Sequence, residues 1–145
     1  MTEQGVLQSL ISKWVSLASE YASGAPDVRA YYIYGASEKP GVTYINVLFE
    51  QAGSLVYPSD LVGANASIER ASLIQRLFRD DLFEARAQFE ALGVQTPTEY
   101  RVYYEPATRK LDVQVSRELI YRYSDREPGT DGFHRWLGDR APKLF

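Results

Sequence analysis

Apolar residues recur at spacings of three and four in two long segments, a period typical of helices with one buried face. In the first segment the recurring residues are Leu7, Leu10, Ile11, Trp14, Leu17, Ala18 and Tyr21. In the second, at about residues 67–92, they are Ala71, Ile74, Phe78, Leu82, Ala85, Phe89 and Leu92. We expect the first helix to end at residues 24–26 and to pack on the chain's own sheet. Asn65 or Ser67 is the expected cap of the second helix, and Gly93 follows its end.

Two large apolar residues of the second helix, Leu73 and Phe83, fall outside its apolar stripe. At about 100° per residue they lie near the opposite face. Polar side chains share that face: Arg76, Asp80 and Glu84. The pattern therefore predicts burial on a second side. The first helix is the favoured cover, and a partner protein is the alternative.

Alternating side chains, with β-branched and aromatic enrichment, predict five strands. Three form a meander: residues 28–34, 42–49 and 54–57, joined by a loop at 35–41 and a turn at 51–53. The last two, residues 99–105 and 111–117, form the clearest hairpin. One side of this hairpin is polar, which predicts a half-covered antiparallel sheet, with one face packed and the other open to solvent.

The last part of the chain, residues 118–145, has a different pattern. Leu119, Tyr121 and Tyr123 continue the alternation briefly, residues 124–131 are expected as loop, and residues 132–137 as a short helix. The whole pattern predicts one α+β domain over residues 1–145. It contains an antiparallel sheet of about five strands, with an N-terminal and a long central helix packed on it and a short C-terminal helix.

Composition narrows the function classes. The net charge of -3 and pI near 5.2 argue against a general nucleic-acid binder and are compatible with ordinary solubility or a basic partner. The absence of cysteine excludes disulfides, thiolate nucleophiles and cysteine zinc sites. Residues 1–24 lack a basic stretch followed by a dense apolar run, and no apolar stretch reaches the length of a membrane span. We therefore expect a cytoplasmic protein.

Reactive groups are sparse. The single histidine, His134, has no Asp, Ser or Cys partner at a fixed spacing, so we expect a surface or packing role. Asp80 and Glu84 share a helix, but Asp81 points about 100° away from Asp80 and no histidine joins them. The glycine-containing turns do not match a phosphate-binding motif. These patterns predict a protein that is not an enzyme and has neither cofactor nor metal.

Eleven tyrosines favour a binding surface, because tyrosine gives a large rigid contact area at low entropic cost. Tyr31, Tyr103 and Tyr123 are expected on the less covered face of the sheet. Three acidic residues of the tail are expected near them: Asp125, Glu127 and Asp131. Such an acidic, aromatic surface suits a basic ligand, of which a nuclease active site is one example.

Six segments in succession resemble the YezG-like family of bacterial antitoxin and immunity proteins. They are VRAYYIYG, VTYINVLFE, SLVYPSDL, LIQRLFRDDLFEARAQFEALG, EYRVYYEPATRKLDVQV and RELIYRYSDREPGTDGFHRWLGD. The resemblance runs from about Leu7 to Asp139 and rests on the order of patterns. The stretch FHRWLGD departs from it, because the family has a longer helix containing Trp and Tyr there. This departure puts an interface in the tail in doubt.

The resemblance implies an antiparallel sheet with helices on one side and tight one-to-one inhibition without a cofactor. The partner it implies is the toxic C-terminal domain of a secreted polymorphic toxin, commonly a nuclease. Our hypothesis is an immunity protein that covers the active site of that domain. The expected partner-binding residues are Asp80, Glu84, Tyr123, Asp125, Glu127 and Asp131. Replacing Asp125 and Glu127 by lysine is expected to weaken toxin binding without unfolding.

The alternative hypothesis is a small-ligand-binding or enzymatic α+β domain with an aromatic pocket. A pocket with clustered polar groups would favour that alternative, whereas a flat or convex acidic face would favour immunity. A third hypothesis, an interaction subunit of an unrelated complex, shares the sequence features of the first.

Overall fold

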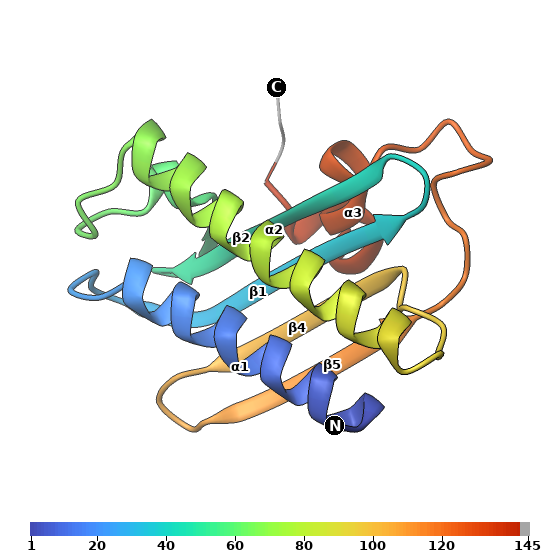
Figure 1. Cartoon of the computed structure of the whole chain (residues 1–145). Helices are drawn as coiled ribbons and strands as arrows, with labels where there is room; N and C mark the ends of the chain where they lie inside the picture. Colours follow the sequence, from blue (N-terminus) through green and yellow to red (C-terminus); the bar gives the residue numbers. More distant parts are fainter. Residues whose placement is uncertain (143–145) are drawn as a thin grey trace.

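The structure, a computed structural model, describes residues 1–142 as a five-stranded sheet between two layers of helix (Figure 1). The strands are β1 (Val28–Glu38), β2 (Val42–Gln51), β3 (Ser54–Val56), β4 (Glu99–Glu105) and β5 (Lys110–Ser116). All neighbours are antiparallel, in the order β3-β2-β1-β4-β5. The α-helices are α1 (Glu3–Tyr21), α2 (Ile68–Ala91) and α3 (Pro128–Leu137). Short 3-10 turns cover Pro58–Asp60 and Gly138–Arg140. The predicted α+β fold is confirmed.

The two long helices begin at capped ends. Thr2 Oγ1 accepts the Gly5 N–H at 3.0 Å, and Ser67 Oγ accepts the Arg70 N–H at 3.1 Å. Each cap satisfies a backbone donor that the first turn of a helix leaves free. Ser67, rather than Asn65, therefore caps α2. Gly93 follows the end of α2 with φ 71°, as its position after the helix predicts.

Helices α1 and α2 lie side by side across one face of the sheet (Figure 1). Trp14 of α1 is fully buried between α2 and the sheet, and its Nε1–H donates to the Phe78 carbonyl at 3.1 Å. A Cβ at Gly35 of β1 would lie 2.9 Å from the Trp14 ring, so this approach requires glycine. The predicted stripe of α2 contributes five buried residues to this core: Ile74, Phe78, Leu82, Ala85 and Phe89.

The third helix covers part of the opposite face of the sheet, over β1 and β2 (Figure 1). Gly132 of α3 contacts the Tyr34 ring so closely that a Cβ would overlap it, and Phe133 packs beside that ring. Helices therefore lie on both sides of the sheet, whereas the resemblance implied one side. The reason lies in β1, which turns Ile33 to the α1–α2 face and Tyr32 and Tyr34 to the α3 face. A central strand that is apolar on both faces needs cover on both.

Two predicted boundaries were wrong. Strand β1 continues to Glu38, so the loop before β2 is only residues 39–41. Residues 117–127 do not continue the β5 alternation, and α3 begins at Pro128 rather than at 132. Proline at the first helical position loses no hydrogen bond and explains the earlier start.

The predicted cover for the second side of α2 was also wrong. Leu73 and Phe83 keep 45% and 39% of their surface exposed, so α1 does not bury them. Tyr31 and Tyr103 were predicted to share a face but lie on opposite faces of the sheet. Residues 143–145 of the predicted domain lie outside the described residues. Among the helices of residues 1–142, none combines the length and apolar character that crossing a bilayer requires.

Candidate functional site

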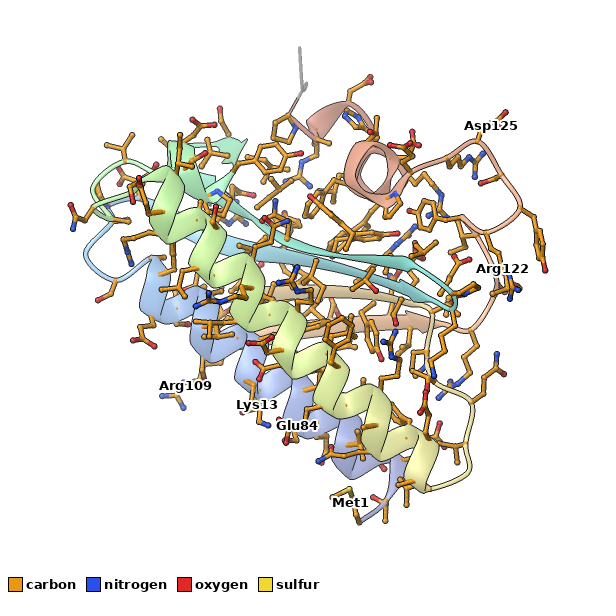
Figure 2. The ribbon with its side chains drawn as sticks, turned by 45° about the horizontal axis from the view of Figure 1, so that its top comes forward. Met1, Lys13, Glu84, Arg109, Arg122 and Asp125 are labelled. Carbon is orange, nitrogen blue, oxygen red and sulfur yellow. The ribbon has the colours of Figure 1, made fainter. Side chains whose placement is uncertain are left out.

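The six predicted partner-binding residues form two groups on opposite sides of the sheet. Asp80 and Glu84 lie on α2, whereas the other four lie in residues 123–131, which lead into α3. Figure 2 shows Glu84 beside Lys13 of α1, with Asp125 far from both on the loop before α3. The structure therefore presents two separate surfaces instead of one.

The surface on α2 combines apolar and acidic side chains. Leu73, Leu77, Asp80 and Glu84 follow spacings of four, three and four, and so share one side of the helix, which we call the α2 outer stripe. Leu73 and Leu77 are 45% and 37% exposed. A shallow notch of about 120 Å³ between α1 and α2 adjoins the two leucines. It is lined by Leu17, Glu20, Tyr21, Arg70, Leu73, Ile74 and Leu77.

The carboxylates on this surface lie close to one another and to one lysine of α1. Lys13 Nζ lies 3.1 Å from Glu84 Oε2, and both side chains are about half exposed to solvent. Partial burial raises the pKa of Asp81, and the carboxylates of Glu84 and Asp80 raise it further, whereas Lys13 lowers it. The carboxylates of Asp80, Asp81 and Glu84 therefore lie close together, while the exposed Arg76 and Arg79 of the same helix offset part of their charge.

The tail surface is less acidic than the sequence suggested. Tyr123 is 79% exposed, and the Arg122 guanidinium lies 5.3 Å from the centre of its ring. Asp125 is exposed, but its neighbour Arg126 carries the opposite charge. These cations alternate with the acids and offset much of their charge.

Two of the predicted tail residues help to form the start of α3. Glu127 is exposed and is the residue that precedes the first turn of the helix. The Asp131 carboxylate accepts the Glu127 N–H at 2.8 Å. Asp131 therefore already serves the fold by satisfying a backbone donor at the helix start.

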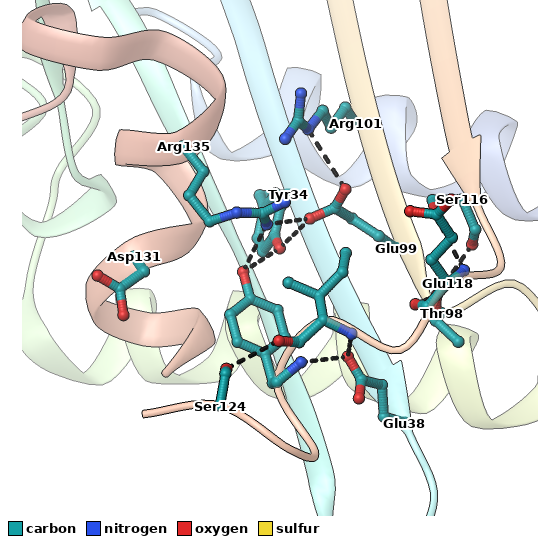
Figure 3. A network of polar contacts seen from close by, with 12 residues as sticks. Tyr34, Glu38, Thr98, Glu99, Arg101, Ser116, Glu118, Ser124, Asp131 and Arg135 are labelled. Atoms are coloured by element: carbon teal, nitrogen blue, oxygen red, sulfur yellow. Dashed lines mark hydrogen bonds and ion pairs between the residues drawn. The ribbon is translucent and has the colours of Figure 1, made fainter. Parts of the chain in front are cut away.

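A buried polar network fixes α3 to the sheet (Figure 3). The Tyr34 hydroxyl donates to Glu99 Oε2 at 2.5 Å, and Arg135 Nη1 of α3 donates to the same oxygen at 2.8 Å. Arg135 also donates to the Tyr121 hydroxyl at 3.1 Å. Burial, followed by the hydrogen bond to Glu99, raises the pKa of Tyr34. The network holds Tyr34 neutral and ties three distant segments together.

A second buried carboxylate fixes the segment before α3. Glu38, only 1% exposed, accepts the backbone N–H groups of three consecutive residues: Ile120, Tyr121 and Arg122. The distances are 2.8, 2.8 and 2.9 Å. Figure 3 shows the Glu38 carboxylate directed at this backbone. These donors are satisfied by a side chain and not by a neighbouring strand, which explains why the predicted alternation does not continue.

A polar hollow of about 320 Å³ opens between α3 and the β4–β5 hairpin, and we call it the α3 cleft. Its floor is the face of the sheet that α3 leaves uncovered: Tyr32, Arg101, Tyr103, Lys110, Asp112 and Gln114. Its wall is the end of α3 and the turn after it: Trp136, Leu137 and Arg140. The prediction of a half-covered sheet is confirmed for the β4–β5 hairpin, whose polar side α3 leaves open, but not for β1 and β2, which are covered on both faces.

Apart from Tyr103, the residues of the α3 cleft were missing from the binding surface predicted from the sequence. Arg101 and Tyr103 stood on the polar side of the predicted hairpin, which was the available signal. What the sequence did not show is that β1 lies between β2 and β4, which pairs Tyr32 directly with Tyr103. Only this pairing brings the aromatic and cationic side chains together.

A second hollow, of about 400 Å³, runs between α1 and the edge strand β5. Its apolar lining comes from Leu7, Ile11, Val15, Tyr104, Leu111 and Val113. Leu111 is half exposed at the start of β5. The groove therefore adds a second apolar surface to the α1–α2 side of the molecule.

Other chemical groups are dispersed. Across residues 1–142, His, Asp and Glu side chains do not gather in threes at a spacing that would hold a metal ion. His134 is exposed on α3. A scan against protein-family models and a search of curated proteins found no match for the chain. The resemblance to YezG-like proteins therefore stays a prediction.

Proposed function

We propose that the protein is an immunity protein, which binds a toxic protein domain and blocks that domain by covering its active site. The observation that carries the proposal is the α2 outer stripe, where exposed leucines and carboxylates share one side of a helix. The succession of segments that resembles YezG-like proteins supports it further. The place of action that fits this role is the cytoplasm of the cell that makes the toxin.

The apolar part of the stripe supplies the anchor of the proposed interface. Leu73 and Leu77 are large, adjacent and exposed, and they border the notch between α1 and α2. Burying apolar surface is worth about 25 cal/mol per Å². Central apolar anchors usually dominate the affinity of an interface, while surrounding contacts exclude water.

The acidic part of the stripe selects the partner. Asp80 and Glu84 present negative charge beside the leucines, and they favour a partner whose active site is basic. A nuclease active site fits this description, because it must attract phosphate. Complementary charge would mainly raise the association rate and the selectivity of binding.

The ion pair between Lys13 and Glu84 does not hold this surface closed. Both side chains are about half exposed, and exposed pairs of this kind contribute about 0–1 kcal/mol. A cation of the partner can therefore replace Lys13 at Glu84 at little cost to the fold. The stripe is available for binding without a rearrangement of the helices.

The test is growth of cells that produce the toxin domain encoded next to this gene. We expect the wild-type protein to co-purify with that domain and to restore growth. The double variant Asp80→Lys/Glu84→Lys should lose about 100-fold in affinity, or about 2.7 kcal/mol, and should fail to protect.

The matched control is Asp125→Lys/Glu127→Lys, which makes the same charge change on the tail surface. The sequence alone predicted weaker binding for this variant, but the structure separates its two carboxylates from Leu73 and Leu77 of α2, so we now expect it to protect. Protection by the α2 variant together with failure of the tail variant would move the interface to residues 123–131. No binding by the wild-type protein would remove the immunity function itself.

A further inference from the structure

We propose that the α3 cleft is a binding site for a small anionic ligand: a planar ring that carries a phosphate or carboxylate and has hydrogen-bond donors. The cleft lies on the face of the sheet opposite to the α2 outer stripe. The site is therefore independent of the proposed immunity function. Its volume of about 320 Å³ is at the lower end of the range for small-ligand sites.

Positive charge reaches the cleft from three separate elements. Arg101 comes from β4, Lys110 from the start of β5, and Arg140 from the turn after α3. Arg140 is itself paired with Glu50, 3.2 Å away, so Arg101 and Lys110 contribute most of the positive charge. Cations that meet from separate elements focus their field in the hollow between them and attract an anion there.

The Arg101 guanidinium is only partly satisfied by residues 1–142, and because its unpartnered Nε is buried, a ligand in the cleft would contact the other two guanidinium nitrogens. Its Nε lies 3.5 Å from Glu99 Oε1, which is an ion-pair distance, but it is buried without a hydrogen-bond partner among residues 1–142. A buried donor left without a partner costs free energy, and guanidinium N–H groups bind phosphate and carboxylate well. Glu99 is also shared with Arg135, whose Nη1 lies 2.8 Å from it. Arg101 is therefore only partly neutralised and can accept a ligand anion.

Aromatic rings supply the apolar contacts of the cleft. The Tyr32 ring lies 4.9 Å from that of Tyr103 and 5.6 Å from that of Trp136, both in edge-on arrangements. Arg140 Nη2 donates to the Tyr32 hydroxyl at 2.9 Å, which fixes this ring in the floor. A row of fixed rings beside cations suits a planar ligand that bears a negative charge.

The remaining polar groups restrict the ligand further. Asp112 and Gln114 of β5 also line the cleft, and their oxygens accept hydrogen bonds. A purely anionic ligand would be repelled by Asp112. A ligand with an amino or hydroxyl donor at one end and the anion at the other would satisfy both groups. A nucleoside monophosphate has this arrangement, and so has a ring-bearing carboxylate with a donor group.

The experiment is a titration of the full chain with adenosine 5′-monophosphate and, separately, with 4-hydroxybenzoate. The signal is tryptophan fluorescence, because Trp136 lines the cleft whereas Trp14 is fully buried in the core. Heats of binding give an independent readout. We expect one of the two probes to bind saturably at about millimolar concentration or below. Binding of the nucleotide alone identifies phosphate as the anion, and binding of the benzoate alone identifies carboxylate.

Two variants test the residues that carry the inference. Arg101→Met keeps the buried stem and removes the donors, and it should weaken binding at least about tenfold. Lys110→Met, at an exposed position, should act in the same direction and keeps the test valid if Arg101→Met does not fold. Arg126→Met, in the loop before α3 and outside the cleft, is the matched control and should bind as the wild type does.

Three results would overturn the inference. The first is the absence of saturable binding by either probe. The second is equal binding by wild type, Arg101→Met and Lys110→Met. The third is that a fragment of the nucleotide binds as tightly as the whole nucleotide. Equal binding of adenosine would show that the cations play no part, and equal binding of inorganic phosphate would show that the rings play none. A failure here leaves the immunity test unaffected, since that test uses the opposite face.

Discussion

On one face of the sheet, α1 and α2 pack through a continuous apolar core, whereas on the other face α3 packs through aromatic rings and a buried ion pair. Trp14 and Phe78 typify the first face, with their rings 6.2 Å apart and edge-on. Glu99 and Arg135 typify the second. The comparison teaches that the two helix layers resist different perturbations, because apolar cores respond to volume and ion pairs to charge.

The difference extends to the surfaces that each layer presents. The α1–α2 layer exposes leucines beside carboxylates, while the α3 layer leaves a basic, aromatic hollow. A protein-sized partner suits the first surface because its exposed groups lie along a helix. A small ligand suits the second because its groups converge. Substitutions in the apolar core are expected to change the stability most, and substitutions in the α2 outer stripe least.

Truncating the apolar core should have the largest effect. Phe78→Ala removes a fully buried ring beside Trp14 and is expected to lower the free energy of unfolding by about 3–5 kcal/mol. Denaturant unfolding followed by circular dichroism gives this value. Phe83→Ala on the same helix is the control, since its 39% exposed ring should cost about 1 kcal/mol or less. Equal costs for the two would contradict the assignment of the core.

Removing the carboxylate of the Glu99–Arg135 ion pair should lower the free energy of unfolding somewhat less than Phe78→Ala does. Glu99→Gln leaves Arg135 without its carboxylate in a partly buried position, and we expect a loss of about 3 kcal/mol. The loss should show first as detachment of α3, which quenching of Trp136 fluorescence would report. The double variant Glu99→Gln/Arg135→Met should recover part of the stability, because it removes one of the two guanidinium groups, those of Arg135 and Arg101, that Glu99→Gln leaves without a carboxylate. A double variant less stable than the single would refute this account of the α3 face.

Alkaline pH should destabilise the α3 face. The expected loss in the free energy of unfolding is similar to that of Glu99→Gln or smaller. Burial raises the pKa of Tyr44 to about 12, from 10.0 for an unperturbed tyrosine. The folded protein thus keeps a proton that the unfolded chain loses. The stabilisation is complete below pH 10 and is lost as the pH rises toward 12, by about 2–3 kcal/mol. Tyr44→Phe should reduce the decline in stability measured across this range, the rest of which comes from other tyrosines with a raised pKa, such as Tyr34 and Tyr100, and an unchanged decline would exclude Tyr44 as a source.

Truncating the exposed stripe should have the smallest effect on stability. Leu73→Ala/Leu77→Ala changes side chains that are more than a third exposed, and we expect the free energy of unfolding to fall by about 1 kcal/mol or less. Binding of the toxin domain should nevertheless weaken strongly. Thermal unfolding and co-purification, measured together, separate the two effects. A large loss of stability would mean that the stripe serves the fold instead of a partner.

The sequence predicted the α1–α2 face better than the α3 face, for a physical reason. Helical periodicity reports which side of α2 is buried, and Phe78 and Phe89 lie where it placed them. Alternation likewise identified the β4–β5 hairpin to within one residue. Both patterns are local, because they arise from the geometry of one element.

The α3 face depends on contacts that no local pattern records. Glu38 binds the Arg122 N–H, 84 residues away, and Glu99 meets Arg135, 36 residues away. The same limit explains the wrong grouping of the tyrosines. Tyr31 and Tyr103 looked equivalent within their own strands, but strand pairing sets Tyr31 opposite Tyr104 and turns Tyr103 to the other face. The α3 cleft was missed for this reason too.

The most direct test of the central claim is an amide NMR titration of the protein with the toxin domain encoded beside its gene. The account predicts that the largest shift changes fall on α2 between Leu73 and Glu84 and on the facing residues of α1, with the α3 cleft unchanged. Shift changes confined to residues 122–131, with α2 unaffected, would contradict it and assign the interface to the opposite face of the sheet.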